Sequence, residues 1–294
     1  MKVRANGLMI EVDDQGPRDA PVVLLVMGLG MQLTGWPEEL VELLLGHGFR
    51  VVRFDNRDAG LSDGFDHVGV PSISLNVLRH FLRLPVRSPY ALKDMAADAV
   101  GVLDALGIAR AHVVGASLGG MIAQHVAATF PERVASLTLI MTTSGSRRLP
   151  GPTAVARRAL LSQPANKELE TLIAHSTSVF TTIGSPGLLP APGQLRERVA
   201  ASIARASRPA GSARQLLAIA ADGDRTAMLA RIQAPTQVIH GAVDPLIPVA
   251  NGRDLLVRIP GALGDFIEGM GHDLPQALLG RIAQGITTNA RRAS

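Results

Sequence analysis

The 294-residue sequence contains no cysteine, which excludes disulfide bonds, thiolate catalysis and cysteine-ligated metal sites. It is also poor in lysine, since only Lys2, Lys93 and Lys167 occur. The net charge of +4 is therefore carried almost entirely by arginine, whose strong basicity explains a pI of about 10.2. The high pI does not indicate a strongly basic surface at neutral pH.

Aromatic residues make up only 3% of the chain, and no basic cluster with interleaved aromatics occurs. This argues against a nucleic-acid partner. Long apolar runs are missing too: the longest, "VVLLVMGLGM", is too short to cross a bilayer. The start, "MKVRANGLMIEVDDQG", alternates like a strand and lacks the basic-then-apolar layout of a signal peptide. We expect a cytoplasmic protein without an integral membrane segment.

The residues that are present, 47% hydrophobic and 18% charged, are typical of a globular protein with a large core. Short apolar runs such as "PVVLLVMG", "FRVVRFDN", "HVVG" and "VASLTLIM" alternate with longer helical patterns. One helix is expected from about Tyr90 to Leu106, with Gly107 placed to end it. Continuous apolar strands separated by helices predict an α/β fold, a mostly parallel sheet with helices on both faces.

This regularity stops after Met141, and residues 143–210 are rich in Pro, Gly and Ser, with short helical pieces and no strand. Strands resume at "PTQVIHG" and "LGDFIEG". We therefore predict a core of residues 1–142 and 211–294, interrupted by a helical lid at 143–210, with an ordinary surface insertion as the alternative. A second stretch, with Ile73, Val77 and Leu78 beside Arg79, is typical of an amphipathic helix that can lie on a membrane surface. A cap helix or a subunit contact is favoured over that alternative, which leaves a homodimer open.

Gly115-Ala116-Ser117-Leu118-Gly119 fits the pattern G-x-S-x-G. Small residues at these positions let a strand turn directly into a helix, which exposes the Ser117 hydroxyl at a strained corner. The first N–H groups of the following helix stay unpaired there and can stabilise an oxyanion. The alternative for Ser117 is a simple helix N-cap.

A nucleophilic hydroxyl needs a base, and the base needs an orienting carboxylate. Asp244 in "VIHGAVDPLIP" follows one strand, and His272 in "FIEGMGHDLP" follows the next. The strand before them ends in "IMTTSG" without a carboxylate, which favours Asp244 as the acid. His125 and His240 are better explained as core histidines. Asp222, Asp224 and Asp254 are better explained as solvated or capping residues.

Two further patterns are weighed against simpler explanations. The charges of "DNRDAGLS", Asp55, Arg57 and Asp58, are expected to pair with one another and shape the floor of the site. His240 and Asp244 lie close enough in sequence to suggest a metal, but no third ligand is spaced to complete a site. We predict no metal and no cofactor.

The chain resembles α/β-hydrolases over nearly its full length, and in particular bacterial esterases of the aclacinomycin-methylesterase and proline-iminopeptidase type. Five ordered blocks carry the resemblance: "VMGLGMQLTGW" (26–36), "FDNRDAGLSDGF" (54–65), "VVGASLGGMIAQHVAATFPERV" (113–134), "PTQVIHGAVDPLIP" (235–248) and "GMGHDLP" (269–275). The resemblance implies that Ser117 is the nucleophile, His272 the general base and acid, and Asp244 the carboxylate that orients the imidazole.

The same resemblance places the oxyanion hole at the backbone N–H groups of Leu29 and Leu118. Met27 stands where many relatives have His, although the aclacinomycin-methylesterase type also has Met there. Trp36 lies near this loop as a core contact or a substrate wall, and Phe180 is an apolar lid residue expected to contact substrate.

These features predict a serine hydrolase that cleaves carboxylic esters with small to medium apolar groups through an acyl-enzyme. Its partner would be a small-molecule ester. Perhydrolases of the haloperoxidase type, lactonases, carbon–carbon bond hydrolases and iminopeptidases use the same residues, so the motifs leave them open. A slow-turnover small-molecule receptor is the alternative from another class. The natural substrate and the acyl-chain preference stay open.

Overall fold

The computed structural model describes residues 1–82, 84–191 and 193–293. In this part of the chain, eight strands form one sheet in the order β1-β2-β4-β3-β5-β6-β7-β8. The strands are β1 (Lys2–Ala5), β2 (Leu8–Gln15), β3 (Val22–Val26), β4 (Arg50–Phe54), β5 (Ala111–Ala116), β6 (Val134–Ile140), β7 (Thr236–Gly241) and β8 (Leu263–Ile267). Only the β1–β2 and β2–β4 pairs are antiparallel, so the mostly parallel sheet predicted from the sequence is confirmed.

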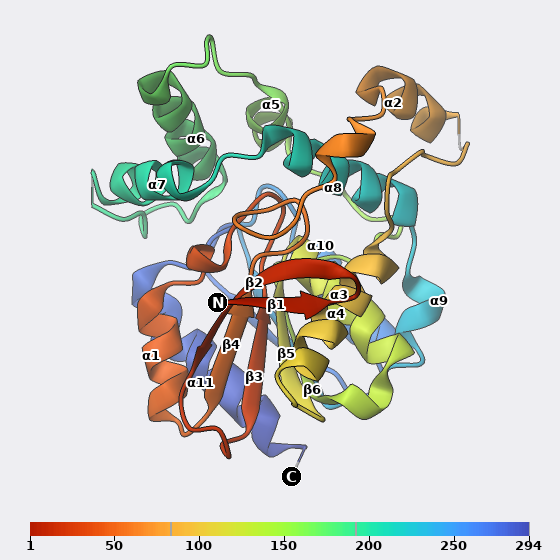
Figure 1. Ribbon diagram of the computed structural model, residues 1–294, viewed down its shortest axis with the longest axis vertical. Helices are drawn as coiled ribbons and strands as arrows, with labels where there is room; N and C mark the ends of the chain where they lie inside the picture. Colours follow the sequence, from red (N-terminus) through yellow and green to blue (C-terminus); the bar gives the residue numbers. More distant parts are fainter. Residues whose placement is uncertain (83, 192, 294) are drawn as a thin grey trace.

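Helices cover both faces of the sheet, as Figure 1 shows. Helices α1 (Glu38–Gly46) and α11 (Leu279–Arg291) contact one face, where Leu40 and Ile282 join a buried apolar cluster. Helices α3 (Leu92–Ala105) and α4 (Leu118–Thr129) belong to the cluster on the other face. Every residue of β3 is buried, because both faces of this strand are covered.

The alternating start of the chain forms a hairpin rather than one strand. Asn6 and Gly7, between β1 and β2, have φ values of 48° and 82°. Positive φ at both central residues of a two-residue turn is typical of an Asn-Gly hairpin. Helix α3 agrees with the helix expected from about residue 90 to 106, and Gly107 follows with a φ of 67°.

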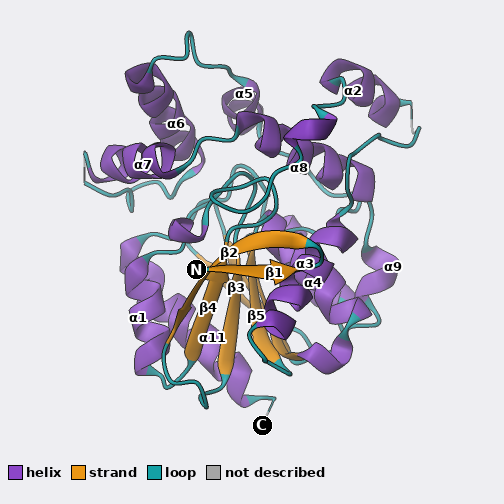
Figure 2. Cartoon of the chain, in the orientation of Figure 1, coloured by secondary structure: helices purple, strands orange, loops and turns teal. Residues whose placement is uncertain are grey.

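Between β6 and β7 the described chain contains helices and no strand, as Figure 2 shows. These helices are α5 (Ala154–Leu161), α6 (Leu169–Ile183), α7 (Gln194–Arg205), α8 (Pro209–Asp222) and α9 (Thr226–Leu229). Helices α5, α6, α7 and α8 lie above the sheet in Figure 1. Helix α10 (Ala250–Arg258) joins β7 to β8. The division into a core and a lid at 143–210 stays a prediction.

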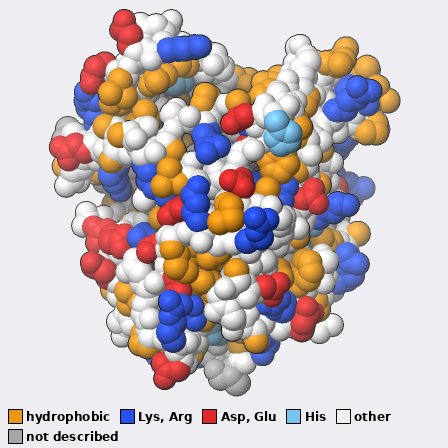
Figure 3. All heavy atoms as spheres, viewed as in Figure 1, with side chains coloured by type: hydrophobic (Ala, Val, Ile, Leu, Met, Phe, Trp, Pro, Cys, Tyr) orange, Lys and Arg blue, Asp and Glu red, His pale blue; other side chains and the backbone are white. Residues whose placement is uncertain are grey.

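Helix α2 (Ile73–Phe81) projects from the upper part of the molecule between β4 and α3. Its side chains Ile73, Leu75, Val77 and Leu78 are exposed, and Figure 3 shows hydrophobic and basic side chains together on the upper lobe at this position. The homodimer that this stretch leaves open stays a prediction. Among the described residues, no helix is both long enough and apolar enough to span a membrane.

Candidate active site

Ser117 occupies the corner between β5, which ends at Ala116, and α4, which begins at Leu118. Its backbone has φ 54° and ψ −118°, a strained conformation for a residue with a side chain. A Cβ on Gly119 would lie 1.9 Å from the Val26 carbonyl oxygen, and a Cβ on Gly115 would lie 2.3 Å from the Gly119 oxygen. The two glycines therefore allow α4 to start directly against the sheet, with the Ser117 hydroxyl at the turn.

The structure brings Ser117, His272 and Asp244 together, although 155 residues separate the first two. The Ser117 Oγ lies 3.1 Å from Nε2 of His272, and the His272 Nδ1 lies 2.7 Å from Oδ2 of Asp244. Both distances are in the range of hydrogen bonds. The three side chains thus form a continuous chain from a hydroxyl through an imidazole to a carboxylate, which can move a proton away from the hydroxyl.

Asp244 is held by its own loop after β7. The backbone N–H groups of Leu246 and Ile247 each donate to its Oδ1 at 2.8 Å, and its side chain is fully buried. Because Oδ1 is occupied by these donors, Oδ2 is left to face His272. The carboxylate can therefore hold the imidazole in one orientation and stabilise its positive charge.

His240 lies on β7 behind this carboxylate. Its Nε2 donates to the Ile247 carbonyl oxygen at 2.8 Å and is 3.6 Å from Asp244 Oδ2. Burial lowers the pKa of His240 and outweighs the opposing influences of the Ile247 hydrogen bond and the Asp244 charge. A neutral His240 braces the loop that carries Asp244 without competing for the role of His272.

The two N–H groups predicted for the oxyanion hole lie on either side of this corner. Among the described residues, neither the Leu29 nor the Leu118 N–H has a hydrogen-bond acceptor. Leu118 starts α4, and Gly28, which precedes Leu29, packs so closely that a Cβ there would lie 3.3 Å from the Cβ of Ser117. Two free donors and a helix N-terminus favour a negative charge at this position.

The two predicted substrate contacts lie in different surroundings. Trp36 is 1% exposed and belongs to the apolar cluster beside α1 and α11, and its Nε1 has no partner among the described atoms. Phe180 lies on α6, where it lines a hollow of about 210 Å³ between α5 and α6 together with Leu160 and Val179. A role in binding substrate stays a prediction for both residues.

The expectation that the charges of "DNRDAGLS" pair with one another is wrong. Each charge pairs instead with a residue far away in the sequence: Asp55 with Arg205 at 2.8 Å, Arg57 with Asp98 at 2.6 Å, and Asp58 with Arg214 at 2.6 Å. Neighbours in a tight loop point in different directions, so each charge meets whichever element packs on its side. The loop thereby joins α3, α7 and α8.

A second set of polar contacts, which no sequence pattern indicated, holds the loop that carries His272. The His272 N–H donates to the Ile183 carbonyl oxygen at 2.8 Å, at the end of α6. The Gly271 N–H donates to Ser185 Oγ at 2.8 Å, and this hydroxyl donates to Asp273. Burial raises the pKa of Asp273. These contacts link the imidazole to α6 across more than 80 residues.

Comparisons with known proteins identify the family of the chain. The family model of the alpha/beta hydrolase fold matches residues 21–275. The rhodomycin D methylesterase DauP of Streptomyces sp. (strain C5) is 31% identical over 297 residues, covering 95% of this chain and 93% of that protein. The pimeloyl-[acyl-carrier protein] methyl ester esterase of Chromobacterium violaceum is 32% identical over 188 residues, covering 63% of this chain and 72% of that protein.

Solved structures show the same architecture. The meta-cleavage product hydrolase CumD of Pseudomonas fluorescens IP01 is similar with a TM-score of 0.76 and 20% identity, covering 100% of this chain and 98% of that chain. At this identity the likeness concerns the fold alone. The family match over residues 21–275 and the 31% identity to a relative across 95% of the chain go further. The chain belongs to the α/β-hydrolase fold family.

Proposed function

We propose that the protein hydrolyses carboxylic esters through an acyl-enzyme on Ser117. The observation that carries this proposal is the unbroken hydrogen-bonded chain Ser117–His272–Asp244 beside the Leu29 and Leu118 N–H groups, for which the described residues provide no acceptor. The names of the relatives support it, because both of those described above are methyl ester or methylesterase enzymes.

In the acylation step, the Ser117 oxygen attacks the ester carbonyl carbon while its proton passes to Nε2 of His272. The carbonyl oxygen becomes an oxyanion, which accepts hydrogen bonds from the N–H groups of Leu29 and Leu118. Asp244 stabilises the resulting imidazolium through Nδ1. The carbon–oxygen bond to the alcohol then breaks, and the alcohol leaves with the proton that His272 had taken.

Deacylation repeats these events with water as the nucleophile. His272 removes a proton from water, the hydroxide adds to the acyl carbon, and the oxyanion forms again at the same two N–H groups. Collapse of this intermediate breaks the bond to Ser117, whose oxygen regains a proton from His272. The carboxylic acid is released and the enzyme returns to its starting state.

Residues 143–210 act as a lid in this proposal and supply apolar surface to the acyl or alcohol group. Support comes from the position of α5, α6 and α7 above the sheet and from the apolar side chains that α5 and α6 carry, Leu160 and Phe180 among them. Such surface suits esters with small to medium apolar groups rather than charged ones.

Turnover of p-nitrophenyl esters from acetate to decanoate by the wild-type protein and by Ser117→Ala tests the proposal. We expect turnover by the wild type and a loss of at least about 1,000-fold in kcat for the variant, because the variant lacks the hydroxyl that forms the acyl-enzyme. A protein that binds these esters without turnover, or a variant as active as the wild type, would contradict the proposal. If the wild type turns over these esters, the acyl length with the highest kcat/KM measures how long an acyl group the site accepts.

A further inference from the structure

The loop that carries Leu29, residues 28–33, is held by side chains and carbonyl groups from distant parts of the chain, and the first of these contacts comes from α8. The N–H of Gly30, the next residue after Leu29, donates to Oε1 of Gln215 on α8 at 2.8 Å. The Gln215 side chain is fully buried, and its Nε2 donates to the Arg57 carbonyl oxygen at 2.8 Å. We call residues 28–33 the oxyanion loop, and its connection to α8 fixes one side of Leu29.

Gln32 connects the same loop to the end of α7. Its side chain is 4% exposed, and its Nε2 donates to the carbonyl oxygens of Ser202 at 2.7 Å and of Ala206 at 3.0 Å. Its Oε1 accepts a hydrogen bond from Arg205. The last turn of α7 is therefore bound directly to a residue three positions from Leu29.

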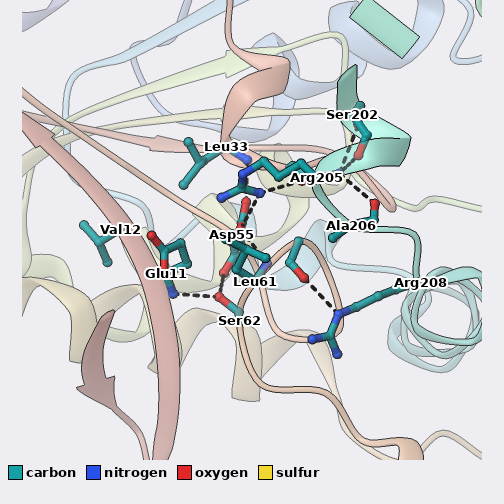
Figure 4. Close-up of polar contacts among 12 residues, drawn as sticks. Glu11, Val12, Leu33, Asp55, Leu61, Ser62, Ser202, Arg205, Ala206 and Arg208 are labelled. Atoms are coloured by element: carbon teal, nitrogen blue, oxygen red, sulfur yellow. Dashed lines mark hydrogen bonds and ion pairs between the residues drawn. The ribbon is translucent and has the colours of Figure 1, made fainter. Parts of the chain in front are cut away.

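Asp55 binds both the oxyanion loop and Arg205. Figure 4 shows Arg205 reaching from α7 toward Asp55, with Leu33 and Leu61 close to the carboxylate. The fully buried Asp55 accepts from the Leu33 N–H at 2.7 Å, from the Leu61 N–H at 2.8 Å and from Arg205 at 2.8 Å. One carboxylate thus holds both the end of the oxyanion loop and the cation from α7.

We propose that Gln32, Asp55 and Arg205 form a latch that positions the oxyanion loop from the junction between α7 and α8. These three side chains are positioning residues, because they act on the reaction only through the direction of the Leu29 N–H. The other donor, Leu118, starts α4 directly after the corner at Ser117 and makes none of these contacts among the described residues. This inference rests on the proposed function, since it assigns Leu29 to the oxyanion hole.

The latch matters because an oxyanion donor works only in one geometry. Deleting a single donor costs about 100-fold or more in kcat, and small displacements of positioning groups also lower rates strongly. A displaced Leu29 N–H still exists, so we expect a smaller effect than deletion. The loss should concern the transition state more than the bound substrate, since the ground-state carbonyl interacts weakly with the hole.

The test is the variant Arg205→Met, which keeps an unbranched side chain but removes the cation. We expect kcat for p-nitrophenyl butyrate to fall about 10-fold with a smaller change in KM. The Kd for n-butylboronic acid, which forms a tetrahedral adduct with a reactive serine, should rise by a similar factor. Both are measured at a temperature at which circular dichroism shows the variant to be folded.

Gln32→Leu provides a second variant, because it breaks the latch while leaving the pair between Arg205 and Asp55 intact. It should show the same parallel change in kcat and boronate affinity, and it decides the question if Arg205→Met does not fold. Arg50→Met is the matched control. Arg50 pairs with the buried Asp14 through two bonds of 2.8 Å at the start of β4, the end of the strand opposite the site.

We expect the control to lose stability and to keep its kcat and boronate affinity. The latch is wrong if Arg205→Met and Gln32→Leu keep wild-type values, or if Arg50→Met loses as much kcat as they do. These results are separable from failure of the proposed function. If the proposed function failed, Ser117→Ala would behave like the wild type, with both proteins or neither turning over esters, whatever the latch variants do.

Discussion

At the residue scale, the surroundings of His240 disfavour a positive charge on its imidazole. Its Nε2 is used by the Ile247 carbonyl oxygen, and its Nδ1 is buried without a partner among the described atoms. Protonation would place an N–H at Nδ1 with nothing to accept it. Burial lowers the pKa of His240 below its ordinary value of 6.5. The negative charge of Asp244 acts in the opposite direction, and a positive charge on His272 acts in the same direction as burial.

This predicts how stability depends on pH. The unfolded chain takes up a proton on His240 near pH 6.5, whereas the folded protein takes it up only at lower pH, so the folded state is favoured above pH 6.5. That contribution is lost as the pH falls through the lower, folded-state pKa. His240→Gln, which can still donate to the Ile247 oxygen, should lose less unfolding free energy than the wild type between pH 7 and pH 5.

Urea denaturation at both pH values measures this difference. The control is His47→Gln, at an exposed position, which should follow the wild type. Equal losses for the wild type and His240→Gln would show that the buried imidazole does not contribute to acid sensitivity.

Some residues of the site could be predicted from the sequence and others could not, for a physical reason. Ser117, Asp244 and His272 each stand just after a strand, and parallel strands bring their carboxyl ends to one edge, so the order of elements brings these residues together. Gln32 and Arg205 carry no such marker. Their contacts join segments 173 positions apart, and only the packing of α7 on the oxyanion loop makes them partners.

At the element scale, the approach of α4 to the sheet depends on Gly119. A Cβ at this position would overlap the Val26 carbonyl oxygen at 1.9 Å, so Gly119→Ala forces α4 away from β3. We expect a loss of about 1–3 kcal/mol or more in unfolding free energy, as for other overpacked sites. Activity should fall as well, because the movement displaces Ser117. Urea denaturation and ester turnover measure the two effects.

Gly280→Ala in α11 is the matched control. A Cβ there meets no atom of the described residues within 4 Å, so the substitution should stabilise the helix by about 0.5–1 kcal/mol and leave turnover unchanged. If Gly119→Ala were as stable and as active as Gly280→Ala, the close contact between α4 and β3 would not be what sets the corner.

Elements of the sheet were predictable because burial on both faces gives β3 a continuous apolar sequence and makes β5 and β6 mostly apolar. The hairpin of β1 and β2 was not separated, since its alternating pattern continues through the turn at Asn6 and Gly7. For the helices above the sheet, the sequence indicated mainly that the alternation of strands and helices stops after residue 141. Nothing in their sequence indicates which loops they contact, because polar partners such as Gln215 look like ordinary surface residues of a helix.

At the scale of the whole molecule, the loop after β4 and helix α8 are joined by a buried ion pair. Arg214 donates to both oxygens of Asp58 at 2.6 and 2.8 Å, and the two side chains are 1% and 0% exposed. The Tyr90 hydroxyl donates to the same carboxylate at 2.8 Å. Segments about 150 residues apart are thereby held in one body, and α8 in turn contacts the oxyanion loop through Gln215.

Breaking this pair should destabilise the protein as a whole. Arg214→Met leaves the Asp58 charge buried without its cation, for which we expect a loss of about 3–5 kcal/mol in unfolding free energy. Arg281→Met is the matched control, because Arg281 also makes two bonds to one aspartate, Asp265, but is 53% exposed. Its loss should be at most about 1 kcal/mol, since water screens an exposed pair. Urea denaturation of both variants gives the two values, and equal losses would mean that the buried pair does not join α8 to the body of the protein.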